Sequence, residues 1–156
     1  MDRAQLPDDE STDLPRLVGR VIQLTDCHLG PTLEYCLAGV LTESSFREVL
    51  VRMQAEAEAP DMVMATGDIS AHGKDIAYQT FTRLMDDTGF SYAWLPGNHD
   101  DFSLMQEGLH ASPYWPVLEL GNWRLISLNT SVPGKVEGRL AAAELAFLAH
   151  CLAAEK

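Results

Sequence analysis

Three short apolar runs of this sequence each end abruptly in residues that can bind metal ions or transfer protons. The runs are predicted β-strands at residues 18–24, 61–66 and 90–95. Two segments with helical periodicity separate them, and this strand-helix alternation predicts an α/β fold with a largely parallel sheet. Ligands bind outside the carboxyl ends of the strands in such sheets. We therefore expect the polar residues that follow the three runs to lie together.

Each predicted strand is followed by a short polar corner. In chain order, the corners are Thr25-Asp26-Cys27-His28, Gly67-Asp68 and Gly97-Asn98-His99-Asp100. Asp26 and His28 are two residues apart, so in an extended chain their side chains would point the same way. Cys27 would then point to the opposite side, which favours a packing role for its thiol. The third corner offers an amide, an imidazole and a carboxylate in succession, and its glycine lets the backbone bend sharply.

The corners together favour a metal site, whose candidate residues are Asp26, His28, Asp68, Asn98 and His99. Oxygen and nitrogen ligands without thiolates suit Mn²⁺, Fe²⁺, Zn²⁺ or Mg²⁺. A carboxylate can bridge two such ions, and a pair of ions stabilises the attacking and leaving oxygens of a displacement at phosphorus. Metal-bound water becomes hydroxide near neutral pH and can attack, while His99 could protonate the departing alkoxide as a general acid. Each corner alone could be an ordinary turn, so the hypothesis rests on their joint occurrence.

Periodicity and turn residues predict the elements around these corners. Residues 26–40 are predicted to form a loop, and residues 42–45 are candidate N-caps of a first helix. The apolar face of that helix is predicted to comprise Phe46, Val49, Leu50 and Met53. A second helix at 73–87 has Ile76, Ala77, Phe81, Leu84 and Met85 at helical spacing, and Gly89 is its predicted C-cap.

The later part of the chain departs from the alternation of strands and helices. We expect a short helix at 101–110, strands at 115–120 and 123–129 joined by a Gly121-Asn122 turn, a loop at 131–138 and a helix at 141–154. The apolar residues of the last helix are Leu145, Phe147, Leu148 and Leu152. The earlier alternation would place another strand after this helix, so we interpret the sequence as the N-terminal portion of a longer domain.

Composition narrows the setting in which this chemistry could operate. The chain has 156 residues, which suits one domain, and its formal charge of -12 argues against binding a nucleic-acid polymer. Residues 1–16 are predicted to be a disordered acidic leader, and residues 17–156 to form the domain. No apolar run is long enough to span a membrane, no secretory signal opens the chain, and three scattered cysteines fit a reducing compartment. We therefore expect a cytoplasmic protein that does not bind membranes.

The corners resemble the motifs of the calcineurin-like metallophosphoesterases. In that family an Asp-x-His motif is followed by Gly-Asp with a downstream Gly, and then by Gly-Asn-His with Asp or Glu. The matching residues here are Asp26-Cys27-His28, Gly67-Asp68 with Gly73, and Gly97-Asn98-His99-Asp100. Within the family, the sequence is most similar to bacterial 3',5'-cyclic-AMP phosphodiesterases and related class III cyclic-nucleotide enzymes. Further similarity lies at residues 23–29, 65–69, 77–79, 94–100, 128–130 and 138–140.

The resemblance implies a four-layer αββα sandwich with two metal ions where its two sheets meet. It implies that Asp26 and His28 hold the first metal and that Asp68 bridges both metals. Asn98 would bind the second metal and approach the phosphate, and His99 would be the general acid near the leaving oxygen. Mn²⁺ or Fe²⁺ is the expected cofactor, and a small cyclic nucleotide such as cAMP is the expected substrate. His72 matches no ligand position of the family, but it follows the second corner closely enough to touch substrate.

Two later histidine motifs of the family do not occur in this sequence, which would leave each metal with part of its ligand set. The main alternative is therefore an inactive or metal-poor fragment, or a binding module. A hydrolase for a lipid-linked pyrophosphate or another phosphodiester is a further alternative. The acidic charge disfavours a nuclease, and residues 67–73 lack the Asp-Arg-Gly that protein phosphatases carry there. The oligomeric state is left open.

Overall fold

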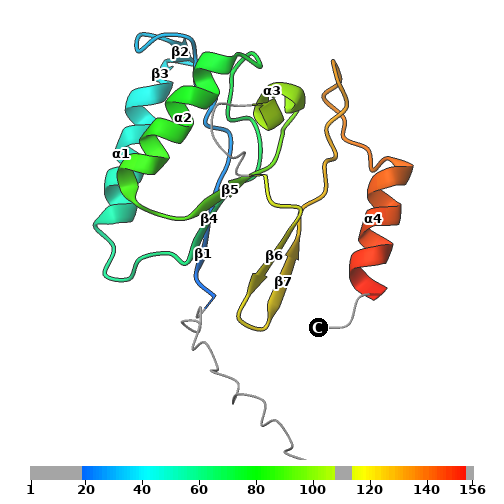
Figure 1. Cartoon of the computed structure of the whole chain (residues 1–156). Coiled ribbons are helices and arrows are strands. Elements are labelled where there is room, and N and C mark those ends of the chain that lie inside the picture. The colour runs from blue at the N-terminus through cyan, green and yellow to red at the C-terminus, as the bar shows by residue number, and fades with distance from the viewer. Residues whose placement is uncertain (1–18, 108–113, 154–156) are drawn as a thin grey trace, which may run out of the picture.

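Four layers of secondary structure make up the part of the chain that the computed structural model describes, residues 19–107 and 114–153. Figure 1 shows helices on one side, then a parallel sheet, a hairpin and a last helix on the other side. The predicted leader at 1–16 lies outside the described residues. The ends of two predicted helices, at 108–110 and 154, also lie outside them.

The three apolar runs form a parallel sheet, as predicted. Its strands are β1 (Val21–Leu24), β4 (Met62–Ala65) and β5 (Tyr92–Trp94), in the order β1-β4-β5. Both pairings are parallel, and every residue of the central strand β4 is buried. A strand that is covered on both faces reads as a continuous apolar run, which explains the sequence of β4. All three carboxyl ends therefore point to one edge of the sheet.

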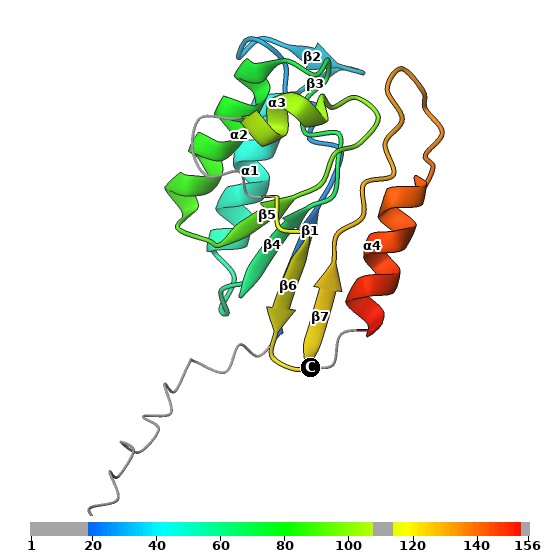
Figure 2. The ribbon, with the colours of Figure 1, turned by 45° about the vertical axis from the view of Figure 1, so that its right-hand side comes forward.

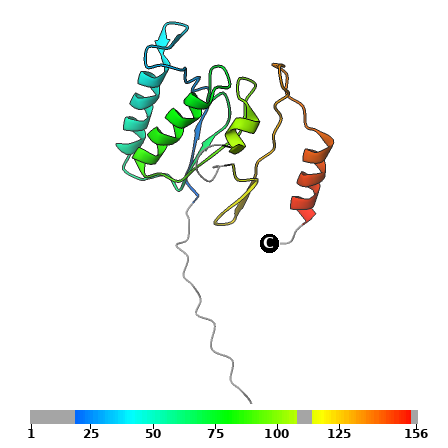
Figure 3. The same ribbon diagram turned by 45° about the horizontal axis from the view of Figure 1, so that its top comes forward.

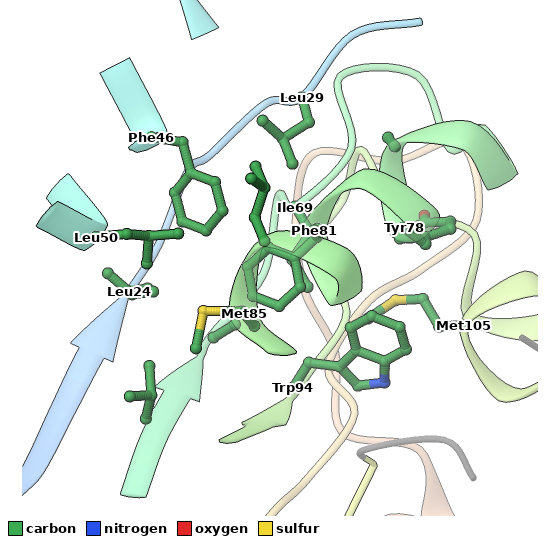
Figure 4. Packing of buried hydrophobic residues seen from close by; sticks show 14 of the residues in the cluster. Leu24, Leu29, Phe46, Leu50, Ile69, Tyr78, Phe81, Met85, Trp94 and Met105 are labelled. Carbon is green, nitrogen blue, oxygen red and sulfur yellow. The ribbon is translucent and has the colours of Figure 1, made fainter. Parts of the chain in front are cut away.

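Helices α1 (Thr42–Gln54) and α2 (Asp75–Thr88) cover one face of this sheet. Figure 4 shows the core between them, in which Phe46 and Phe81 stack with ring centroids 5.3 Å apart. The predicted helical faces are confirmed except at Val49 and Ile76, which are 39% and 44% exposed. Tyr78, which the periodicity did not select, is buried instead.

Two local predictions around the helices are wrong. The N-cap of α1 is Leu41 without a side-chain cap, because Thr42 is already the first helical residue. The predicted loop at 26–40 contains a short antiparallel pair, β2 (Cys36–Leu37) and β3 (Val40–Leu41), which leads directly into α1. The C-cap of α2 is confirmed, since Gly89 has a φ of 74° in the left-handed region that glycine favours.

The second sheet is the predicted hairpin of β6 (Val117–Leu120) and β7 (Trp123–Ile126), which follows the short helix α3 (Phe102–Glu107). Leu118 and Leu120 of β6 pack against Met62, Met64 and Ala93 on the free face of the parallel sheet. The two sheets therefore lie face to face and share a small apolar core.

Helix α4 (Ala142–Ala153) forms the fourth layer. Arg124 of β7 projects from the face opposite to the inward-facing Leu125, and its guanidinium donates to the Cys151 carbonyl of α4 at 3.1 Å. Figure 2 shows α4 beside β7, and Figure 3 shows it on the other side of both sheets from α1 and α2. The αββα arrangement is thus present in the described residues. Leu145 and Leu152 are 51% and 71% exposed, so the apolar pattern of α4 is only partly buried.

No helix in the described ranges is long and apolar enough to cross a membrane.

Candidate metal centre

Backbone hydrogen bonds continue past the ends of the strands and fix the first two corners side by side. The Asp26 amide donates to the Gly67 carbonyl at 3.1 Å, and the His28 amide donates to the Asp68 carbonyl at 2.8 Å. A further parallel bridge joins Leu29 to Ser70. The two corners therefore behave as an extension of the sheet rather than as free loops, and this sets the positions of their side chains.

The backbone within these corners is left-handed rather than extended. Asp26, His28 and Asp68 have φ values of 56°, 42° and 50°, and only Ala38 joins them among the described non-glycine residues with positive φ. This corrects the expectation that Asp26 and His28 approach each other through an extended chain. Left-handed geometry is uncommon for such residues and is found at functional sites where surrounding structure holds it in place.

Glycines allow the second and third corners to touch. A Cβ on Gly97 would lie 2.2 Å from Asp68 Oδ1, and a Cβ on Gly67 would lie 2.8 Å from the Gly97 Cα. Gly67 also has a φ of 115°, which side chains rarely permit. The glycine of each motif is therefore explained by the close approach of two backbones at the site.

The side chains of Asp26, His28 and Asp68 converge at the edge of the sheet. His28 Nε2 lies 3.6 Å from Asp26 Oδ1 and 3.9 Å from Asp68 Oδ2. Ligand atoms about 2.0–2.2 Å from one ion are about 3–4 Å apart, so these spacings fit a shared cation. Neither carboxylate forms an ion pair with a lysine or arginine of the described residues. The negative charge at this edge is therefore left for a bound cation to balance, and the donor set fits a divalent metal.

His99 completes a group of side chains that could hold a metal ion, together with His28 and Asp68. Its backbone amide donates to Asp68 Oδ1 at 2.9 Å, which orients that carboxylate. Its ring Nδ1 lies 2.9 Å from the Ala71 carbonyl. A carbonyl can only accept, so Nδ1 carries a proton and Nε2 is the atom available for chemistry. The rings of His28 and His99 meet edge to face, with centroids 4.8 Å apart.

Asn98 is exposed and lines two cavities, whose walls also share Gly97 and Ser131. The smaller cavity, of about 280 Å³, contains Asp26 and Asp68 in its wall. The larger one, of about 630 Å³, contains His72 and His99. His72 also forms a hydrogen bond of 3.1 Å with the Tyr35 hydroxyl. The structure thus brings all six predicted site residues to one edge, with Asn98 and His72 on cavity walls.

Two parts of this site, a segment and a single residue, were given no role in the sequence analysis. The segment at 130–138 lines both cavities, although its only sequence signal is the similarity at 128–130 and 138–140. The Asp100 carboxylate accepts from the backbone amides of Gly97 and Ser70, both at 2.9 Å. Its place in the Gly-Asn-His-Asp motif is therefore structural, because it joins the second corner to the third.

Cys27 packs against the main core, as predicted. Burial, with smaller contributions from the charges of Asp100 and Asp26, raises the pKa of its thiol to about 12. A thiol with such a pKa stays protonated near neutral pH, and thiolate is the form that binds metals. Its packing against the core gives Cys27 a structural role, despite its position between two candidate ligands.

The family model for calcineurin-like phosphoesterases matches residues 19–140. The chain is 33% identical over 133 residues to the 3',5'-cyclic adenosine monophosphate phosphodiesterase CpdA of Pseudomonas aeruginosa, covering 85% of this chain and 49% of that protein. It is 32% identical to CpdA of Escherichia coli, covering 86% and 50%. A cAMP/cGMP dual specificity phosphodiesterase of Mycobacterium tuberculosis is 29% identical, covering 85% and 45%.

The chain spans about half the length of the curated relatives it matches. The matched residues of the family model include all three corners and the segment that lines the cavities. The chain therefore belongs to the calcineurin-like phosphoesterase family.

Proposed function

We propose that this chain carries metal-binding residues of a phosphodiesterase that hydrolyses 3',5'-cyclic nucleotides, with cAMP as the preferred substrate. The observation that carries the proposal is the convergence of Asp26, His28 and Asp68 beside the free Nε2 of His99. The names of the matched relatives support the choice of a cyclic nucleotide. We further propose that residues 17–156 form one domain.

The proposed metal ligands divide between the two ions of a dinuclear site. Asp26 and His28 would hold the first ion, Asp68 would contact both ions, and Asn98 would hold the second ion. Mn²⁺ or Fe²⁺ is preferred, with Zn²⁺ or Mg²⁺ as substitutes, because the donors are oxygen and imidazole nitrogen. When bound, such ions supply Lewis acidity at phosphorus and lower the pKa of water.

The protein's own groups supply orientation and a proton. The Asn98 amide reaches the phosphate from the wall that the two cavities share. The His99 ring is held through its Nδ1 by Ala71, so a proton on Nε2 can pass to the departing ester oxygen. His72, held by Tyr35, contacts the substrate from the larger cavity.

A small anionic substrate is compatible with the strongly acidic chain only if bound cations reverse the local charge. The formal charge of -12 makes long-range attraction of a nucleic-acid polymer unfavourable. Lys74 is the single lysine or arginine among the residues that line the two cavities. We propose a cytoplasmic enzyme that acts on a diffusible phosphodiester, not on a polymer or a membrane.

The test is hydrolysis of bis(p-nitrophenyl) phosphate and of cAMP by the purified chain with added Mn²⁺. Turnover that requires Mn²⁺ and is lost in Asn98→Ala supports the proposal. The Asn122→Ala variant is the matched control, because Asn122 lies in the turn between β6 and β7. A folded chain that binds no Mn²⁺ and hydrolyses neither ester would support the alternative of an inactive, metal-poor form.

A further inference from the structure

We propose that Tyr78 is a positioning residue that holds the third corner, and with it Asn98 and His99, against the second. The proposal concerns a residue of helix α2 that lies outside the metal cluster. Its consequence for turnover rests on the proposed function, whereas its consequence for the backbone does not.

The Tyr78 hydroxyl forms two hydrogen bonds at the end of the third corner. It donates to Asp100 Oδ1 at 3.2 Å and accepts from the Asp101 amide at 2.7 Å. Asp100 in turn accepts from the amides of Ser70 and Gly97. A weaker contact of 3.3 Å from the Ile69 amide completes this set. A single phenol thus connects helix α2, through Asp100, to the backbone amides of Ser70 and Gly97.

Asn98 and His99 are the residues enclosed by this network. Asp100 closes the third corner by binding the Gly97 amide, so the two residues between them cannot move independently of it. The same carboxylate fixes Ser70, two residues beyond Asp68. Displacing Asp100 would therefore change the separation of Asp68 from His99, which the 2.9 Å bond between them now sets.

The position of Tyr78 in the core makes its hydroxyl a rigid anchor. Only 2% of its surface is exposed, and its ring contacts Trp94 edge to face with centroids 5.9 Å apart. Figure 4 shows Tyr78 at one edge of the main cluster, near Trp94 and Met105. Burial and the nearby Asp100 carboxylate raise the pKa of Tyr78, so the hydroxyl keeps its proton and remains a donor.

Tyr92 provides a matched control within the same core. Its hydroxyl donates to Asp86 Oδ1 at 3.0 Å, and burial likewise raises its pKa. Its ring contacts Phe81, which belongs to the same cluster as Tyr78. Asp86, however, is an exposed residue of α2. Among the described residues, it accepts no hydrogen bond from a backbone amide of the metal corners. The variants Tyr78→Phe and Tyr92→Phe therefore each remove a phenol–carboxylate bond, but only one of these bonds reaches the site.

The first readout is the rate of amide hydrogen exchange in the metal-free chain, measured by NMR. In Tyr78→Phe, we expect the Ser70, Gly97 and Asp101 amides to exchange about tenfold faster, because a net hydrogen bond is worth about that factor. In Tyr92→Phe these amides should exchange at the wild-type rate. Equal exchange in the two variants overturns the proposal, whether or not the chain is an enzyme.

The second readout is the Mn²⁺ affinity and the kinetics of the same two variants. Tyr78→Phe should bind Mn²⁺ more weakly and have a lower kcat at an unchanged KM, since misplacement of His99 affects the chemical step. If Tyr78→Phe changes KM alone, or matches Tyr92→Phe in both parameters, the positioning role is wrong. A wild-type chain without Mn²⁺ binding or turnover counts against the proposed function only, because the exchange test remains decisive. If Tyr78→Phe fails to fold, Asp100→Asn provides the same exchange test on Gly97.

Discussion

Two halves of the molecule differ in how completely they are packed. The parallel-sheet half comprises β1, β4 and β5 with α1 and α2, and the hairpin half comprises β6 and β7 with α4 and the segment between them. Val63 and Ala65 of β4 are 0% exposed under α1 and α2, whereas Trp123 of β7 and Leu152 of α4 are 73% and 71% exposed. The parallel-sheet half supplies all four proposed metal ligands, and the hairpin half supplies a cavity wall at 130–138. The groups that need precise placement thus lie on the well-packed half.

The largest expected effect is a loss of turnover when a glycine that lines a cavity is replaced by alanine, and it should differ between the two halves. In Gly97→Ala the new Cβ would lie 2.2 Å from Asp68 Oδ1, so the corners must separate. We expect turnover to fall by about 100-fold, the cost of displacing reacting groups by about 1 Å. In Gly134→Ala the Cβ meets open space at a φ of 71°, so we expect a strain of about 1 kcal/mol and little change in turnover. Similar losses of turnover in the two variants would contradict the contrast.

The next effect separates two histidines within the parallel-sheet half. His99→Ala should lower kcat for cAMP by about 100-fold, at the low end of the contribution of a general acid. The loss should be smaller for aryl phosphodiesters, whose leaving groups need no proton. His72→Ala should instead raise KM, because His72 lines the larger cavity, where we propose that it contacts the substrate. Equal losses of kcat for both substrates in His99→Ala would show that His99 is not the acid.

Stability measurements compare the cores of the two halves. Phe81 is 0% exposed in the main cluster, and Phe81→Ala should lower the free energy of unfolding by about 3–5 kcal/mol. Leu120 is 1% exposed in the small cluster, and Leu120→Ala should cost about 2 kcal/mol, at the low end for such changes. Urea denaturation followed by circular dichroism measures both values. A larger loss in Leu120→Ala would show that the small core contributes more than its size suggests.

The smallest expected effect is a difference between the halves in how readily each opens locally and exposes its cysteine thiols to solvent. Cys36 is exposed, Cys151 is buried on α4, and Cys27 is packed in the first corner. Because burial raises the pKa of Cys27 to about 12, little of its thiol is thiolate at pH 8, so it reacts slowly unless the corner opens. In dilute urea we expect labelling in the order Cys36, Cys151, Cys27, measured by mass spectrometry. Labelling of Cys27 before Cys151 would mean that the metal corner is the weaker part.

The same contrast decides how much of the structure the sequence could predict. The parallel sheet, helix positions, hairpin and converging corners followed from apolar runs, helical spacing and glycine turns. Those signals are local, and they are strong where an element is buried on both faces, as β4 is. The pair β2–β3 was missed because strands of two residues carry no periodicity. The exposed positions of α4 were missed because apolar spacing alone does not reveal which face is covered.

The site was predictable as a set of residues but not as a geometry. The left-handed backbone at Asp26 and Asp68 depends on bonds between corners that are 42 residues apart in the sequence, which local patterns do not encode. The role of Asp100 was hidden for the same reason, because its partners Ser70 and Tyr78 belong to other elements. The motif identified which side chains lie at the edge, and the structure determined which of them face the cavity.

The most direct test of the metal centre is Mn²⁺ binding to the purified chain, measured by calorimetry. Asp68→Asn keeps the side-chain shape but removes the charge that lies beside His28, while Asp86→Asn makes the same change on the far end of α2. We predict that Asp68→Asn weakens Mn²⁺ binding by at least about tenfold, roughly the effect of disturbing groups close around a metal site. Asp86→Asn should bind like the wild-type chain. Equal affinities in the two variants would contradict a metal site built on the three corners.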